Sequence, residues 1–112
     1  MQTVVELPEF IRRTHGLLST SETQLLVNYL AEFPQSGDLM QGTGGVRKLR
    51  WAREGTGKSG GVRVIYYFHS EDIPLYLLTI FAKNERANLT MAERNELAQL
   101  AKQLVKISRR RK

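Results

Sequence analysis

The start of the chain combines a short extended run with a short stretch at helical spacing. Thr3 to Glu6 contains the run Thr-Val-Val, which favours extended backbone. Pro8 suits the first turn of a helix, where its missing N–H does no harm. Gly16 can end such a helix because glycine accepts the backbone angles of a helix C-terminus. The pattern predicts a short strand followed by a short helix.

A second helix is predicted between a capping box and a proline. In Ser19-Thr-Ser-Glu22 the serine hydroxyl and the glutamate can each bond a free backbone N–H. Pro34 ends the helix because the residue before a proline avoids helical angles. The stretch that follows, PQSGDLMQGTGG, is a polar, glycine-rich connection. Apolar residues recur at three- and four-residue spacing, and we expect them to form one face against a sheet: Leu25, Leu26, Tyr29, Leu30 and Phe33.

The second half of the chain changes to strand-like patterns. Val46 to Trp51 reads as a strand with mixed faces, and Val62 to Phe68 is rich in β-branched and aromatic residues. Leu75 to Phe81 is almost wholly apolar, which predicts a strand covered on both faces. His69 to Pro74 joins the last two strands as a short hairpin connection. Thr90 to Glu93 is a second capping box, and the helix after it has one apolar face: Leu97, Leu100, Ala101, Leu104 and Val105.

The predicted order is β-α-α-β-β-β-α, which indicates an α+β fold with an antiparallel-rich sheet. A length of 112 residues suits one domain, and we place it at residues 1–108 with a basic tail at 109–112. There is no apolar run that could span a bilayer. The first residues do not have the pattern of a signal peptide. We therefore expect a cytoplasmic protein with no membrane partner.

Composition adds charge to this picture. The chain has 17 Lys and Arg against 11 Asp and Glu, a net charge of +6, and no cysteine. The cysteine count excludes disulfides and thiol catalysis, while the positive charge is typical of domains that meet nucleic acid or an acidic protein. Taken alone, each basic run favours a solvated surface over a binding site. The runs are Arg109 to Lys112 and, between residues 47 and 63, Arg47, Lys48, Arg50, Arg53, Lys58 and Arg63.

The segment AREGTGKS, Ala52 to Ser59, fits the spacing of a nucleotide-binding P-loop. A P-loop must follow a buried strand and open directly into a helix, whose N-terminus meets the phosphates. Here the motif leads into GGVRVIYYF, which is strand-like. We interpret the match as chance and predict a hairpin loop between two antiparallel strands.

Alternation along these strands predicts a cationic cluster. Lys48 and Arg50 share a face, whereas Arg47 points the other way with Leu49 and Trp51. Arg63 lies within an apolar run, where either an edge position, a partner carboxylate or a phosphate could account for it. The end of the last strand adds Lys83, Asn84, Glu85 and Arg86. In an antiparallel meander Arg63 should approach Lys83 and Asn84, so Lys48, Arg50, Arg63 and Lys83, from three segments of the chain, could converge at one end of the sheet.

Other candidate side chains have plainer interpretations. His15 and His69 stand alone in sequence, which favours surface or packing roles over catalysis. Glu85 could be a base or could form an ion pair with Arg63 or Arg86. Trp51 and the Tyr66–Tyr67 pair are expected in the core, although an exposed ring could stack on a base. No His, Asp and Glu set suggests a metal site, and no cofactor is predicted.

Three segments together resemble the RelE/HigB toxins of bacterial toxin–antitoxin pairs, most closely the HigB-like branch. They are G-T-G-G-x-R-K-x-R, G-K-x-G-G-x-R-V-I-Y-Y and A-K-N-E, and the likeness runs from the first strand to the last helix. The resemblance implies a RelE-like fold and a metal-independent endoribonuclease that cuts mRNA in the ribosomal A site. It also implies partners: 16S rRNA, mRNA and a helix-turn-helix antitoxin of the HigA type.

The resemblance assigns the catalytic positions to Lys48, Arg50, Arg63 and Lys83. The tyrosine that some members carry near the final helix is missing, since no tyrosine follows Tyr76. Lys48 and Lys83 are the candidates for moving a proton, because neighbouring cations lower the pKa of a lysine. Further basic and polar residues are candidates for RNA contacts: Arg47, Arg53, Lys58, Asn84 and Arg86.

The sequence is also compatible with two alternative functions. One is a topoisomerase inhibitor of the related ParE branch, and the other is a nucleic-acid-binding module without catalysis. The cationic cluster favours RNA cleavage over the ParE-like function. For the antitoxin we expect direct protein contact at a surface that need not include the cluster, because the sheet should consume the apolar faces of both long helices.

Overall fold

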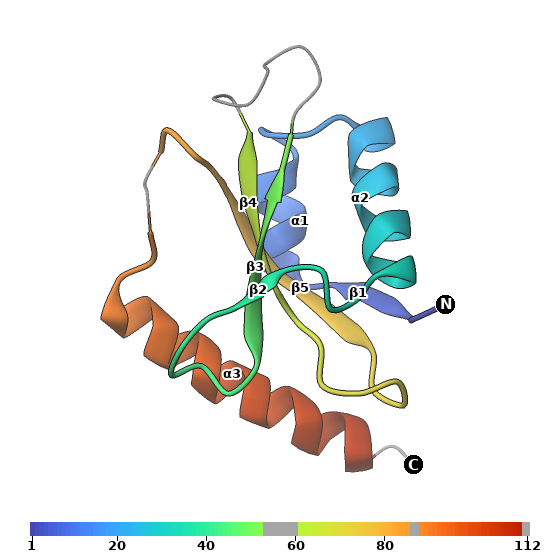
Figure 1. Ribbon diagram of the computed structural model, residues 1–112, viewed down its shortest axis with the longest axis vertical. Helices are drawn as coiled ribbons and strands as arrows, with labels where there is room; N and C mark the ends of the chain where they lie inside the picture. The colour runs from blue at the N-terminus through green and yellow to red at the C-terminus, as the bar shows by residue number, and fades with distance from the viewer. Residues whose placement is uncertain (53–60, 86–87, 111–112) are drawn as a thin grey trace.

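The computed structural model describes residues 1–52, 61–85 and 88–110, which form three helices and five strands (Figure 1). The predicted α+β class is confirmed. In chain order the elements are β1 (Val4–Glu6), α1 (Pro8–Thr14), α2 (Thr20–Glu32), β2 (Asp38–Leu39), β3 (Val46–Trp51), β4 (Val62–Tyr67), β5 (Leu75–Ala82) and α3 (Met91–Arg110).

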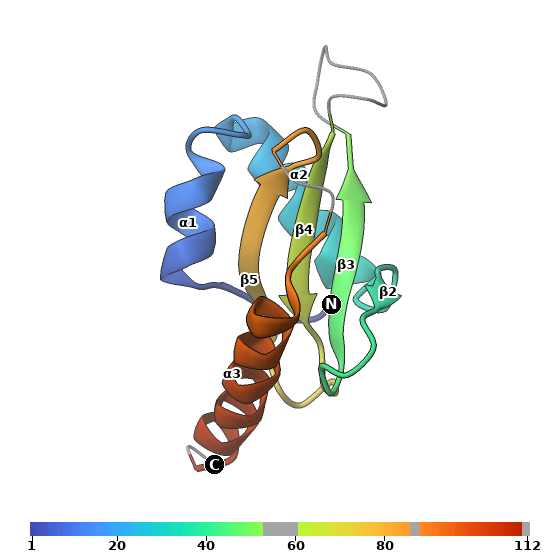
Figure 2. The ribbon, with the colours of Figure 1, turned by 90° about the vertical axis from the view of Figure 1, so that its left-hand side faces the viewer.

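The strands form one sheet in the order β1-β5-β4-β3-β2. β1 runs parallel to β5, and the three other pairings are antiparallel. All eight residues of β5 are buried, which confirms the predicted two-sided strand. In Figure 2, α3 lies in front of the strands and α2 behind them. The side chains of Phe10, Leu26 and Leu30 fill the core on one side of the sheet, and those of Ala101 and Leu104 fill the core on the other.

β2 is an element that the sequence did not predict. Asp38 and Leu39 pair with Lys48 and Arg47 inside the glycine-rich connection. Two residues cannot show an alternating pattern, so only the tertiary pairing reveals this strand. The turn after it needs glycine, because Gly42, Gly44 and Gly45 have φ angles of 75°, 72° and 118°. This turn is closed by Thr43, whose hydroxyl donates to the Met40 carbonyl at 2.6 Å and accepts from the Val46 N–H at 3.1 Å.

Both capping boxes are confirmed. The Ser19 hydroxyl accepts from the Glu22 N–H at 3.1 Å, and the Glu22 carboxylate accepts from the Ser19 N–H at 2.9 Å. Thr90 and Glu93 make the same reciprocal pair at 2.8 and 3.1 Å. The helix after Thr90 continues through Arg109 and Arg110, two of the four residues assigned to the basic tail. No helix among the described residues is both long and apolar enough to cross a membrane.

The prediction that α2 turns all five of its apolar residues to the sheet is wrong. Leu26 and Leu30 are fully buried, but Leu25, Tyr29 and Phe33 are 63%, 37% and 53% exposed. The five residues cover a wider arc of the helix surface than the arc that contacts the sheet. The stripe at i, i+4 and i+8, which is Leu25, Tyr29 and Phe33, therefore faces outward. The Tyr29 ring lies 5.2 Å from that of Phe33 and 5.3 Å from that of Trp51.

Candidate active site

Two arginines face each other across neighbouring strands. The register of β3 and β4 places Arg50 directly opposite Arg63. Side chains in such a pair have Cβ atoms about 4.5–5.5 Å apart, and like charges in this position are destabilising. Lys48 lies two residues before Arg50 and therefore shares its face. Lys48, Arg50 and Arg63 thus bring three cations together on one face of two neighbouring strands.

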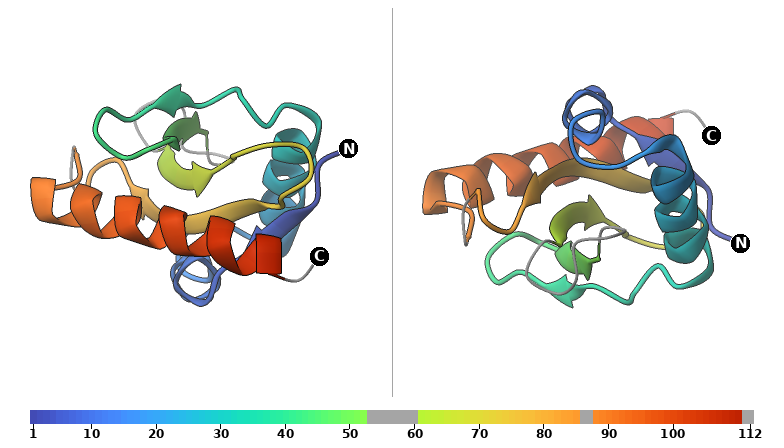
Figure 3. Two further views of the ribbon diagram at one scale, coloured as in Figure 1. Left: turned by 90° about the horizontal axis from the view of Figure 1, so that it is seen from below. Right: turned by 90° about the horizontal axis from the view of Figure 1, so that it is seen from above.

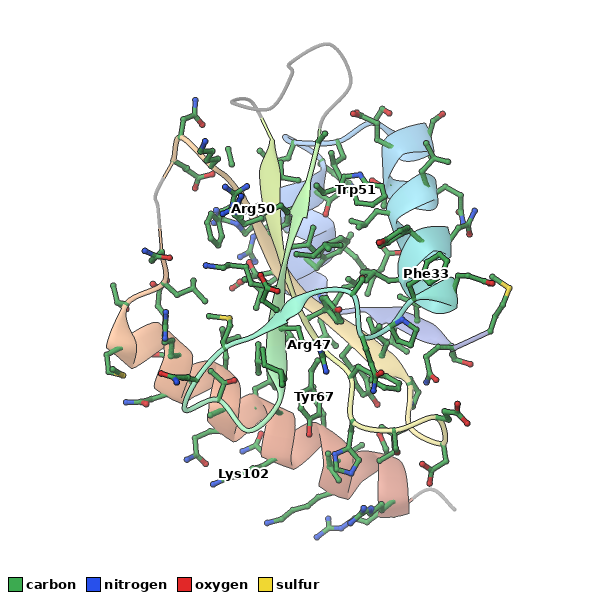
Figure 4. The ribbon with its side chains drawn as sticks, viewed as in Figure 1. Phe33, Arg47, Arg50, Trp51, Tyr67 and Lys102 are labelled. Atoms are coloured by element: carbon green, nitrogen blue, oxygen red, sulfur yellow. The ribbon has the colours of Figure 1, made fainter. Side chains whose placement is uncertain are left out.

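Lys48 is held by a residue that sequence reasoning missed. Its Nζ donates to Asn88 Oδ1 at 3.3 Å, across 40 residues of sequence. Asn88 lies between β5 and the capping box of α3. Nothing in the local pattern marked it, because its role depends on where this segment passes over the sheet. In Figure 4, Arg50 lies on the side of β3 that faces the same segment.

Lys83 joins the same end of the sheet. Its N–H donates to the Gly61 carbonyl at 3.0 Å, next to the start of β4. Arg63 pairs with Phe81, two residues before Lys83. The predicted approach of Lys83 and Asn84 to the start of β4 is therefore present, and both side chains are exposed. We call Lys48, Arg50, Arg63 and Lys83 the cationic cluster, and none of the four forms a salt bridge within the described residues.

Arg47 does not belong to the cationic cluster. It lies on the opposite face of β3, as alternation predicted, and its guanidinium donates to the carbonyls of Gln35 at 3.0 Å and Gly37 at 2.7 Å. The Gly37 N–H donates to the Tyr66 hydroxyl at 2.8 Å. Arg47 thus fixes the connection between α2 and β2, and the structure does not bring it to the other candidates for RNA contact.

Glu85 has a structural partner that was not among the two expected. Its Oε2 accepts from the guanidinium of Arg13 at 2.7 Å, and its Oε1 accepts from the Ala82 N–H at 3.2 Å. The Arg13 Nε–H also donates to the Ile80 carbonyl at 2.7 Å. Arg13 therefore joins α1 to β5 and to the turn that carries Lys83.

The two histidines lie just after two different elements, α1 and β4. His15 follows α1 and is exposed. His69 follows the other end of β4, where its Nδ1 is 3.2 Å from the Tyr67 hydroxyl and its Nε2 is 3.4 Å from Arg109. Burial raises the pKa of Tyr67, and Arg109 opposes that shift. Among the described residues, no three His, Asp or Glu side chains gather in a group that could hold a metal ion.

Part of the candidate set lies outside the described residues. These are Arg53, Lys58 and Arg86, together with most of AREGTGKS. The two strands that flank this motif, β3 and β4, are antiparallel neighbours. The next element after the motif is strand β4, not a helix, as the hairpin interpretation requires.

The chain is a small basic α+β domain that carries the cationic cluster at one end of its sheet. Residues 26–111 match the family model described as the RelE toxin of the RelE / RelB toxin-antitoxin system. The chain belongs to the RelE toxin family. It is therefore a toxin of a toxin–antitoxin system, and proteins of this family act together with an antitoxin partner.

Proposed function

We propose that this toxin is a ribosome-dependent mRNA endoribonuclease that inhibits translation. The observation that carries the proposal is the opposition of Arg50 and Arg63 on neighbouring strands. A folded protein gains nothing in stability from two cations placed opposite each other. Their placement is useful when a phosphate lies between them, because the guanidinium fork matches phosphate oxygens.

The cleavage needs only the RNA and the protein side chains. The 2′-hydroxyl oxygen attacks the adjacent phosphorus, and the bond from phosphorus to the 5′-oxygen breaks. The 2′-hydroxyl loses its proton and the departing 5′-oxygen gains one, which gives a 2′,3′-cyclic phosphate and a free 5′-hydroxyl. Negative charge gathers on the phosphate oxygens in the transition state, where preorganised cations stabilise it most.

The roles follow from position. Arg50 and Arg63 face the phosphate and stabilise its charge. Lys48 and Lys83 stand beside them and are the candidates for proton transfer. Asn88 accepts a hydrogen bond from Lys48, which keeps the amine in one orientation toward the cluster. Asn84 follows Lys83 and would contact the RNA.

The same resemblance that assigns these roles suggests the setting. The toxin would act on mRNA in the ribosomal A site, with basic surface against 16S rRNA, and would pair with a helix-turn-helix antitoxin as HigB-like toxins do. The net charge of +6 supports contact with RNA. The site of action would be the cytoplasm, where ribosomes translate.

The test adds purified toxin to translating ribosomes and, separately, to the same mRNA without ribosomes. The proposal expects breaks at defined codons only with ribosomes, and fragments with cyclic phosphate and 5′-hydroxyl ends. Arg63→Ala should give no breaks, and Lys102→Ala, which removes an exposed α3 lysine, should cleave like wild type. Intact mRNA combined with blocked gyrase supercoiling would replace this proposal with the ParE-like function.

A further inference from the structure

A cleft separates the start of α1 from the first half of α3, beside β5. Figure 3, with Figure 2, shows these two segments near each other beside β5. The cleft has a volume of about 460 Å³, within the range of about 300–1,000 Å³ that ligand sites occupy. Leu7, Leu78, Leu97 and Leu100 line it. Leu97 and Leu100 are only half-buried although they pack against the core, so the cleft leaves apolar surface open.

A buried hydroxyl in the cleft has no hydrogen-bond partner in the described part of the chain. Thr79 lines the cleft and is 4% exposed, and its Oγ1 makes no hydrogen bond within the described residues. The register of β4 and β5 shifts next to Ile65, which pairs with Thr79, so Leu78 and Thr79 both line this cleft. A buried hydroxyl without a partner costs about 1–3 kcal/mol. The hydroxyl can be satisfied by a polar group that enters the cleft.

The charge of the cleft is opposite to that of the chain. Its charged lining residues in the described part of the chain are Glu9, Glu93 and Glu96. Glu9 and Glu93 lie in first turns of helices, where an acidic residue is stabilising in its own right. Glu96 is one turn further along α3, and this explanation does not extend to it. An acidic, apolar cleft repels RNA and attracts a basic, apolar segment.

We propose that this cleft is the docking site for the antitoxin. An antitoxin segment would insert apolar side chains between Leu97 and Leu78, place lysine or arginine beside Glu9 and Glu96, and bond the Thr79 hydroxyl. The assignment rests on the membership of the RelE toxin family and not on the cleavage chemistry. Leu89 also lines the cleft, and the preceding residue, Asn88, holds Lys48. A bound segment would therefore stand beside the cationic cluster without covering it.

The experiment measures binding of the purified antitoxin, encoded beside the toxin, by calorimetry. The toxin carries Arg63→Ala so that it can be expressed. Glu9→Lys combined with Glu96→Lys should weaken binding by about 100-fold or more. The matched control reverses two exposed acids that do not line the cleft, Glu32→Lys with Glu71→Lys, and should bind within about threefold of the parent. Thr79→Val, which keeps the shape and removes the hydroxyl, should weaken binding by about tenfold.

Further arms separate the other possible surfaces and occupants. Alanine at all four positions of the cationic cluster should leave affinity within about tenfold, or 1.4 kcal/mol. The proposal is overturned if this cluster variant loses binding while the cleft variant retains it. It is also overturned if the cleft variant dissociates a dimer of the toxin alone in sedimentation, since the occupant would then be a second copy. As a folding control, the cleft variants are also made with Arg63 retained. Growth arrest by these variants equal to that by wild type would show that their folding and activity are intact.

Discussion

Arg13 of α1 and Glu85 after β5 form an ion pair at 2.7 Å although 72 residues separate them in sequence. The same guanidinium donates to the Ile80 carbonyl, and the same carboxylate accepts from the Ala82 N–H. β1 pairs with β5 only from Leu75 to Leu77. Arg13 therefore bonds the stretch of β5 that lies beyond this pairing. The turn that holds Lys83 is thus tied to the first helix.

Arg13→Ala should therefore lower both stability and activity. It removes a charged hydrogen bond to a backbone carbonyl and a partly exposed ion pair, so we expect a loss of about 1–3 kcal/mol in the free energy of unfolding. Urea unfolding measures this loss, and mRNA cleavage should fall because the Lys83 turn is less well held. Arg12→Ala is the control, since its pair with Glu9 is long, 3.9 Å, and exposed. Equal losses of stability and cleavage in Arg13→Ala and Arg12→Ala would show that the contacts of Arg13 do not hold the Lys83 turn.

Arg63→Ala should abolish toxicity while the protein stays folded. Loss of one preorganised charge at a transition state typically lowers the rate by about 10²–10³. Because Arg50 would no longer face a like charge, stability should be unchanged or slightly higher. Cleavage rate and thermal unfolding of the same preparation give both quantities. Growth arrest equal to wild type, from a well-expressed variant, would remove Arg63 from the site.

Neighbouring residues on β3 should give opposite phenotypes. Arg47→Ala removes two hydrogen bonds to the carbonyls of Gln35 and Gly37, so it should lower the free energy of unfolding by about 1–3 kcal/mol. Lys48→Ala should leave stability within about 0.5 kcal/mol and reduce cleavage strongly. Urea titration and the cleavage assay are compared for both. A folded Arg47→Ala protein that loses activity as completely as Lys48→Ala would place Arg47 in the RNA site.

The segment AREGTGKS should not act as a nucleotide site. We expect no saturable binding of ATP or GTP by calorimetry, since the element that follows the motif is a strand. Gly57→Ala and Ser59→Ala should reduce cleavage less than Lys48→Ala does. A P-loop needs both the glycine backbone and the serine hydroxyl. Larger losses of cleavage in Gly57→Ala and Ser59→Ala than in Lys48→Ala would therefore support nucleotide binding.

Alkaline conditions should destabilise the protein through its buried tyrosines. Burial raises the pKa of Tyr66, and the hydrogen bond from Gly37 opposes the shift. The pKa of Tyr67 is also raised by burial. Above a pH of about 10 the unfolded chain loses these protons while the folded chain keeps them. The tyrosines' contribution to the free energy of unfolding should therefore be fully present below that pH. It should be lost as the pH rises through the folded pKa values.

This dependence can be measured by urea unfolding at increasing pH, with tyrosinate absorbance as the second signal. Tyr66→Phe should flatten the alkaline slope and also lower stability at neutral pH, because the Gly37 N–H loses its acceptor. A slope that is the same in Tyr66→Phe and Tyr67→Phe as in wild type would assign the alkaline loss to other groups.

Local rules were enough for much of the fold. Capping boxes fixed the starts of two helices, and alternation placed Lys48 and Arg50 on one face with Arg47 on the other. The antiparallel order of the strands then brought Lys83 toward Arg63. These features depend on neighbours in sequence or on adjacent strands, which a pattern can encode.

Long-range contacts were beyond the sequence patterns. Asn88 and Arg13 act on partners 40 and 67 residues away, through segments whose paths no local signal fixes. The outward stripe of α2 was mispredicted because helical spacing identifies apolar positions but not the width of the surface that covers them. β2 is too short to show any period.

The position of Trp51 gives the protein an intrinsic fluorescent probe. It is the single tryptophan of the chain, it is half-buried, and its ring lies 5.3 Å from Tyr29. Figure 4 shows Trp51 and Phe33 on the side of β3 that faces α2. Trp51 follows Arg50 directly in the chain but points to the other face of the sheet. Its intrinsic fluorescence should therefore follow folding without an attached dye. When a ligand binds the cationic cluster, this fluorescence should change only if the strand itself moves.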